Sequence, residues 1–163
     1  MLPRVLPDGL RQFTASKAHG KTLLALGIDA LVWAALGRDE TIDRIVCEQP
    51  RQQLAPIAAD DARAKLAALM ALALRARVEA LPFMPKAGFA LLQHEDAARA
   101  LREAEASWRG NFGEGNNPWV STALRGAEPF VDPAATLRFA ELAREVFADL
   151  PGLDVDATEV ADD

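Results

Sequence analysis

The sequence predicts a helix-rich α/β (α+β) protein with a small sheet. Half of its 163 residues are apolar, alanine and leucine dominate, and apolar side chains recur at helical spacing over several long stretches. The short stretch 41–48 is instead rich in β-branched residues, and a second apolar stretch, 53–57, follows it after a turn at Pro50. We therefore expect one domain, residues 1–150, in which helices accompany a hairpin near 41–57.

The N-terminal third is predicted to contain an arm and one helix. Residues 1–13 carry two prolines and a glycine, which indicates an irregular arm. A helix should follow a cap at Thr14 or Ser16 and end at Leu36, because Gly37 stands where a C-terminal glycine belongs.

The hairpin should be limited by Pro56. Proline cannot donate to a strand ladder, so the second strand, 53–57, should be an edge strand or should end at that residue.

The middle of the chain is predicted to hold the most buried helix. This helix should be capped by Asp60 or Asp61 and run to Leu81, with a wide apolar face. The segment 81–86, Leu-Pro-Phe-Met-Pro-Lys, then forbids a continuous helix, because each proline lacks an N–H and restricts the residue before it. Since the segment is apolar, we expect a buried connector with Phe83 and Met84 packed inward.

Three helices are expected after the connector. The patterns predict a short one over 87–93, a clearer one over 95–108, and a last one over 133–150 that begins with Asp132 as its cap and Pro133 at its first position. The glycine-rich polar stretch 111–118 should form a long loop.

The net charge of −6 is confined to the C-terminus. Residues 1–147 hold 18 basic and 18 acidic side chains, whereas residues 148–163 hold six acids and no base. We expect residues 151–163 to form a disordered acidic tail. The folded part lacks the basic excess that marks a self-sufficient nucleic-acid-binding protein.

The composition also predicts a cytoplasmic protein. The longest apolar runs are interrupted by glycine and charged residues, so no membrane span is expected. Residues 1–4 show no hydrophobic signal region, and the single cysteine, Cys47, excludes an internal disulfide and fits a reducing cytosol.

The sequence contains few residues that could form a metal-binding, phosphate-binding or catalytic site. The two histidines lie far apart without partners at zinc-ligand spacing, and the glycines near 110–115 lack a phosphate-binding lysine motif. A metal-dependent nuclease hairpin would need an acid on one strand, then an acid and a lysine on the next. The first strand carries the acids Asp43 and Glu48, but the second strand, 53–57, contains no acid and no lysine. We therefore expect no catalytic, metal-binding or cofactor-binding residue.

Two alternatives remain open. A divergent but active Mg²⁺-dependent nuclease would draw its acids from elsewhere, for example Glu114 and Asp132. A plain helical protein-interaction module would lack the 41–57 hairpin.

Several motifs in order carry a family resemblance. They are the segments 14–21 (Thr-Ala-Ser-Lys-Ala-His-Gly-Lys), 81–86, and Trp108-Arg109-Gly110 followed by Gly113-Glu114. Across residues 12–150 the chain resembles the C-terminal domain of RecC, the gamma subunit of exodeoxyribonuclease V (RecBCD). It departs from the family pattern at Gly27, where a bulky residue is frequent, and at Asn117, where an aspartate is frequent.

The resemblance implies a mixed α/β core similar to the RecB nuclease domain, a restriction-endonuclease-like fold that has lost its catalytic residues. It implies a non-catalytic scaffold that docks the RecB and RecD subunits and guides DNA during double-strand-break repair by homologous recombination. The complex, not this domain, would be the ATP-dependent helicase–nuclease. The chain would then be a piece of a longer subunit.

Contact residues are also predicted. We expect Trp33 and Trp108 to be core residues. Candidate DNA contacts are Lys17, Lys21 and Lys86, and candidate partner contacts are Trp119, Phe83 and Met84.

Overall fold

The computed structural model describes residues 2–6, 9–125 and 128–153, and these form two compact units. Unit 1 contains the residues up to Ala73 together with the returning segment Asp149–Leu153, and unit 2 contains Leu74–Ala148. The predicted acidic tail beyond Leu153 lies outside the described residues. In the part of the chain that is described, no helix is both long and apolar enough to cross a membrane.

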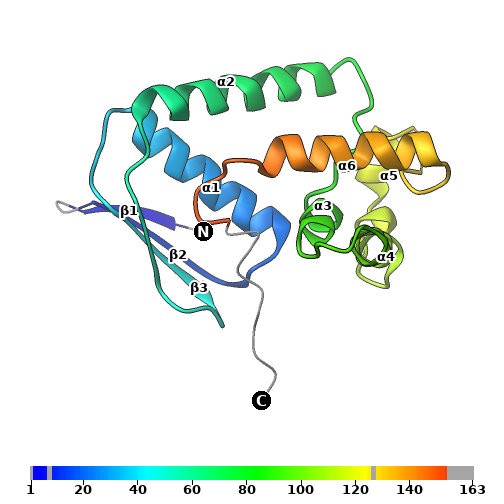
Figure 1. Ribbon diagram of the computed structural model, residues 1–163, viewed down its shortest axis with the longest axis horizontal. Coiled ribbons are helices and arrows are strands. Elements are labelled where there is room, and N and C mark those ends of the chain that lie inside the picture. Colours follow the sequence, from blue (N-terminus) through cyan, green and yellow to red (C-terminus); the bar gives the residue numbers. More distant parts are fainter. Residues whose placement is uncertain (1, 7–8, 126–127, 154–163) are drawn as a thin grey trace. The chain divides into compact units, whose positions relative to one another are not determined.

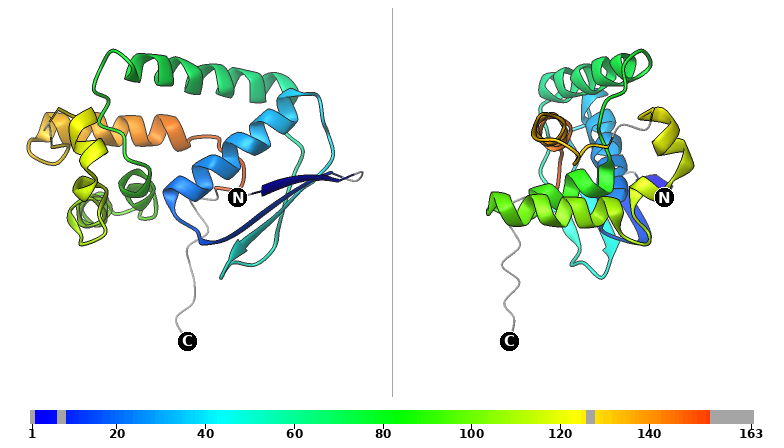
Figure 2. Two further views of the ribbon diagram at one scale, coloured as in Figure 1. Left: turned by 180° about the vertical axis from the view of Figure 1, so that it is seen from behind. Right: turned by 90° about the vertical axis from the view of Figure 1, so that its right-hand side faces the viewer.

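Unit 1 is built on a four-stranded mixed sheet with the order β1-β2-β3-β4 (Figure 1). The strands are β1 (Leu2–Leu6), β2 (Gly9–Lys17), β3 (Ile42–Cys47) and β4 (Gln52–Leu54). β2 and β3 are parallel, and both outer pairs are antiparallel. Parallel neighbours need a crossover, and helix α1 (Gly20–Ala35) supplies it across one face of the sheet (Figure 2).

The N-terminal prediction of an irregular arm was wrong. The segment forms β1 and most of β2, because Pro3 lies in an edge strand, where a missing N–H need not break the ladder. The predicted helix caps were also wrong, since β2 continues through Thr14 to Lys17. His19 caps α1 instead, with Nδ1 accepting a hydrogen bond from the Thr22 N–H at 3.3 Å.

The predicted hairpin is confirmed in type and place. β3 and β4 pair antiparallel, with Ile42 opposite Leu54 and Arg44 opposite Gln52. β4 is shorter than expected, because it ends at Leu54, before Pro56 is reached.

A buried arginine connects the sheet with the returning segment of unit 1. The Arg44 side chain is almost completely buried, and its Nε donates to Gln12 Oε1 at 2.9 Å. Gln12 is also buried and donates to the Leu26 carbonyl of α1 at 2.7 Å. Arg44 Nη1 donates to the Pro151 carbonyl at 2.8 Å. One network therefore joins β2, β3, α1 and the segment 149–153.

Two glycines allow this segment to approach closely. A Cβ at Gly27 would lie 3.0 Å from Leu150 Cδ2, which explains why α1 carries no bulky residue there. Gly152 has a φ of +71°, and a side chain on it would collide with the Arg44 guanidinium.

Helix α2 (Ala59–Ala76) is not the most buried helix, contrary to the prediction. Ala62 is its one buried residue, whereas Met70 and Leu74 are 63% and 55% exposed. Arg63 Nε donates to the Ala35 carbonyl, which holds the start of α2 beside the end of α1. An amphipathic pattern indicates which face favours burial, but it does not provide the surface that covers that face.

Unit 2 is helical. It contains α3 (Pro85–Leu92), α4 (Ala97–Arg109), the 3₁₀ helix η1 (Glu114–Asn116), α5 (Pro118–Ala123) and α6 (Pro133–Phe147). The three longer helices agree in position with the predictions. The stretch 111–118 is not simply a loop, because it contains η1 and leads directly into α5, whose first turn Asn117 caps by accepting from the Trp119 N–H at 3.0 Å.

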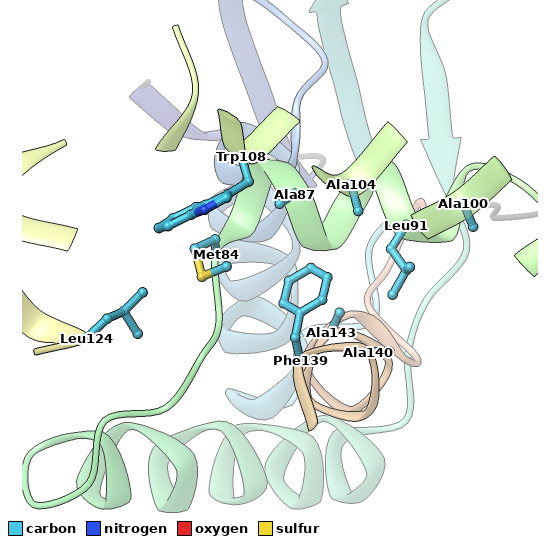
Figure 3. Close-up of a cluster of buried hydrophobic side chains, with 10 residues drawn as sticks. All are labelled: Met84, Ala87, Leu91, Ala100, Ala104, Trp108, Leu124, Phe139, Ala140 and Ala143. Carbon is cyan, nitrogen blue, oxygen red and sulfur yellow. The ribbon is translucent and has the colours of Figure 1, made fainter. Parts of the chain in front are cut away.

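The core of unit 2 confirms the predicted burial of Met84, whereas the other residues of the connector 81–86 are only partly buried. Met84 packs with Trp108 and Phe139 in a cluster drawn from α3, α4 and α6 (Figure 3). Phe83 is partly buried, and its ring centroid lies 5.9 Å from that of Phe147. The cap of α6 is also as predicted, because Asp132 Oδ1 accepts from the Ala135 N–H at 2.9 Å.

We predict that Arg44→Met lowers the free energy of unfolding by about 2–4 kcal/mol, because it leaves the buried Gln12 oxygen and the partly buried Pro151 carbonyl without these donors. Urea denaturation followed by circular dichroism measures the change. The exposed Arg77→Met serves as the matched control and should stay within about 0.5 kcal/mol of the parent protein. Equal stability of both variants would show that the network does not stabilise the fold.

Candidate functional site

The face of the sheet opposite the buried side chains of β3 carries Asp43, the acid predicted for the first strand of the hairpin. Side chains alternate along β3, so that Ile42, Arg44 and Val46 are buried. Asp43 therefore points to the opposite face. The strand register places it between Arg11 of β2 and Gln53 of β4.

Two arginines bind the Asp43 carboxylate. Arg11 Nε donates to Oδ2 at 2.9 Å. Arg51 makes a bidentate contact, with Nε donating to Oδ1 and Nη2 donating to Oδ2 at 2.9 Å. Because one carboxylate faces two guanidinium groups, the cluster carries a net charge of +1.

The electrostatics favour the ionised carboxylate. Hydrogen bonding from Arg51, with a further contribution from Arg11, holds the pKa of Asp43 below its ordinary value of 3.8, although burial opposes the shift. The carboxylate in turn raises the pKa of Arg51. On the buried face of the same strand, desolvation lowers the pKa of Arg44 to about 10, partly offset by Asp29.

The hairpin does not fit a divalent metal. A magnesium site requires several free oxygen ligands, but Asp43 is engaged by arginine and β4 presents glutamines and a leucine. Glu48, the second predicted acid, pairs with Lys17 at 2.7 Å. Among residues 2–6, 9–125 and 128–153, no group of three or more histidine, cysteine or acidic residues is arranged to hold a metal ion.

The two acids of the alternative nuclease have structural partners. Asp132 caps α6, and Glu114 Oε2 accepts from the backbone N–H groups of Lys86 and Ala87, both at 3.0 Å. Glu114 thus caps α3 from the glycine-rich segment, because Met84, the residue at the N-cap position, makes no side-chain bond there. Sequence reasoning missed this cap, since its partners lie 27 and 28 residues away.

The predicted DNA-contact lysines differ in their surroundings. In unit 1, Lys17 ends β2 in its ion pair with Glu48, and Lys21 is exposed in the first turn of α1, which contains no acid. In unit 2, Lys86 Nζ lies 3.4 Å from the Phe112 carbonyl.

The predicted partner-contact residues also differ. Trp119 is 82% exposed at the start of α5, whereas Met84 is buried and Phe83 partly buried. Trp33 and Trp108 are both buried, as expected of core residues.

These observations define a helix-rich α/β protein whose sheet carries an arginine-bound carboxylate in its hairpin. Residues 1–96, more than half of the chain, match the family described as the RecC C-terminal domain, and the chain belongs to that family. Membership implies a place in the multi-subunit RecBCD complex. A comparison with curated proteins found no match.

We predict that the stabilisation provided by Asp43 disappears in acid. A carboxylate with a lowered folded-state pKa stabilises the fold above the unfolded value near 3.8 and loses this effect as the pH falls through the folded value. The difference in unfolding free energy between the parent and Asp43→Asn should therefore be largest near pH 7 and shrink below pH ~4. Urea titrations at several pH values measure it, with the exposed Asp39→Asn as control. A difference that is independent of pH would contradict the ion-pair description.

Proposed function

We propose that the chain is a non-catalytic scaffold domain of a RecC-type subunit. In this role it docks the RecB and RecD subunits in the cytoplasm and guides DNA during double-strand-break repair by homologous recombination. The observation that carries the proposal is the engagement of Asp43 by Arg11 and Arg51.

The arginine pair supports the loss of a nuclease site. Two guanidinium groups bind the Asp43 carboxylate with fixed positive charge, and Lys17 pairs with Glu48, the second acid of the hairpin. The neighbouring strand β4 adds no acid and no lysine. Arginine thus neutralises the carboxylate where a working site would need a cation and a water-activating base.

The topology supports a nuclease-like, restriction-endonuclease-like origin. A hairpin (β3–β4) lies beside a parallel strand, β2, and a helix covers one face of the sheet. This mixed arrangement disfavours a plain helical interaction module, which would lack the hairpin. An active divergent nuclease built on Glu114 and Asp132 draws no support from the contacts of these acids, because both cap helices.

Exposed apolar surface supports the docking part of the role. Trp119, Met70 and Leu74 are large apolar side chains left mostly open to solvent. Large aromatic and aliphatic residues of this kind anchor protein interfaces.

We predict that the purified chain does not cleave linear duplex or single-stranded DNA in the presence of Mg²⁺ or Mn²⁺. Gel electrophoresis of end-labelled DNA measures cleavage. The scaffold proposal is wrong, and the chain is a nuclease, if the parent protein cuts DNA and Asp43→Ala abolishes the cutting. In that case the controls Arg11→Ala and Glu114→Gln, which changes the cap of α3, should still cut. Cutting that survives Asp43→Ala but is lost in Glu114→Gln would instead favour the divergent nuclease.

We predict that Lys21→Glu, introduced into the assembled complex, weakens DNA binding. The plot of log K against log salt should also become less steep, with the magnitude of its negative slope reduced by about one. The reason is the loss of a phosphate contact near a helix start that carries no acid. Fluorescence anisotropy at several salt concentrations measures it. Lys86→Glu tests the second candidate, and Arg102→Glu on α4 is the control. Identical slopes in all variants would remove DNA guidance by these lysines from the proposal.

A further inference from the structure

Unit 2 contains an apolar groove on its surface. The groove has a volume of about 520 Å³, within the range of ligand-sized clefts. Nine of its twelve lining residues are apolar, and they come from α3, α4, the segment before α6, and α6 itself. An unfilled apolar groove of this size costs free energy in water, so it favours an occupant.

The floor of the groove is rigid because it continues into the core. Leu91, Ala100 and Ala140 belong both to the groove and to the buried cluster of unit 2. Leu91 and Ala100 lie at the end of that cluster away from Trp108 (Figure 3). An occupant would therefore meet a preformed surface, which reduces the entropy cost of binding.

Two large side chains at the groove are already in contact with solvent. Val131 is 68% exposed and Leu137 is 58% exposed. Both line the groove, one on the segment before α6 and one in its second turn. They provide the kind of apolar contact that dominates interface energies when it is buried by a partner.

The polar residues of the groove differ in what they already bind. Asp132 and Thr136 are satisfied within their own chain, by the Ala135 N–H and by the Pro129 and Asp132 carbonyls. The Arg144 side chain is exposed and makes no ion pair or hydrogen bond with any described residue. The groove thus combines an apolar wall with one unpaired cation.

The length of the groove indicates the form of the occupant. Asp132, the N-cap of α6, and Arg144 within the helix are twelve residues apart, or about 18 Å along the helix axis. Three turns of a second helix laid along α6 would present apolar anchors at i, i+3 or i+4, and i+7 to such a wall.

We propose that this groove is a docking site for an amphipathic helix of another subunit of the complex, with apolar anchors along Val131 and Leu137 and a carboxylate paired to Arg144. The inference rests on the proposed scaffold function, since it names the surface through which one partner is held. The unpaired guanidinium favours a carboxylate on the part of the helix that lies beside Arg144, because a cation there would be repelled, while the Asp132 carboxylate at the start of α6 keeps the lining neutral as a whole.

The test uses the chain assembled with the other subunits of the RecBCD complex from the same organism. We expect Leu137→Glu to weaken assembly about tenfold or more and Arg144→Glu to weaken it severalfold, measured by surface-immobilised binding. Ala134→Glu and Glu141→Arg, both exposed positions of α6 outside the groove lining, are the matched controls and should bind like the parent. Thermal melting by circular dichroism checks that each variant is folded.

A photo-crosslinker at Val131 identifies the occupant. The expected product joins it to a helical segment of another subunit that carries apolar residues and an acid, and reversal of that acid should restore binding to Arg144→Glu. If the chain assembles but neither groove variant weakens assembly, the docking site is wrong while the scaffold function stands. If the chain does not assemble at all, both are wrong. If it dimerises through the groove when alone, as seen by sedimentation, a second copy is the occupant and the proposal fails.

Discussion

The fold of unit 1 depends on the burial of Arg44. A guanidinium removed from water needs acceptors for its donors. Nε and Nη1 of Arg44 find theirs on a neighbouring strand and on a segment more than a hundred residues later in the chain, whereas Nη2 has no partner among the described residues. The requirement fixes β2 against β3, and through Gln12 it also fixes α1 on the sheet. The same network stabilises the segment 149–153 against the sheet, because Pro151 supplies an acceptor and Gly152 leaves room for the guanidinium.

The strand that buries Arg44 also turns Asp43 to the opposite face of the sheet, because side chains alternate along a strand. A one-residue shift of β3 would exchange them, leaving an acid under α1 and an arginine beside Arg11. The register chosen by the buried arginine therefore also places the carboxylate where Arg11 and Arg51 reach it. The chemical character of the outer face follows from the packing of the inner face.

The sequence predicted local features well and long-range partners poorly. The hairpin, the cap at Asp132 and the buried Met84 were predictable because each rests on residues within a few positions. β1 and β2 were not, since two prolines and a glycine suggested irregular chain and only pairing with β3 makes β2 a central strand. The binding of Asp43 by two arginines and the capping of α3 by Glu114 were also not predicted. Their partners are brought together by the fold and leave no periodic signal.

Helix α2 has a composition that favours a helix, but most of its apolar side chains are not buried. Eight of its eighteen residues are alanine, and Arg75 in its last turn pairs with Glu79 just beyond its end. Intrinsic propensity and a local contact therefore favour the helix without a core. Its apolar face was taken to mean burial in this chain, yet Met70 and Leu74 remain exposed. Propensity decides that a segment is helical, whereas burial needs a second surface. In a family whose members act within a multi-subunit complex, an exposed apolar face is what one expects when part of that second surface belongs to another chain.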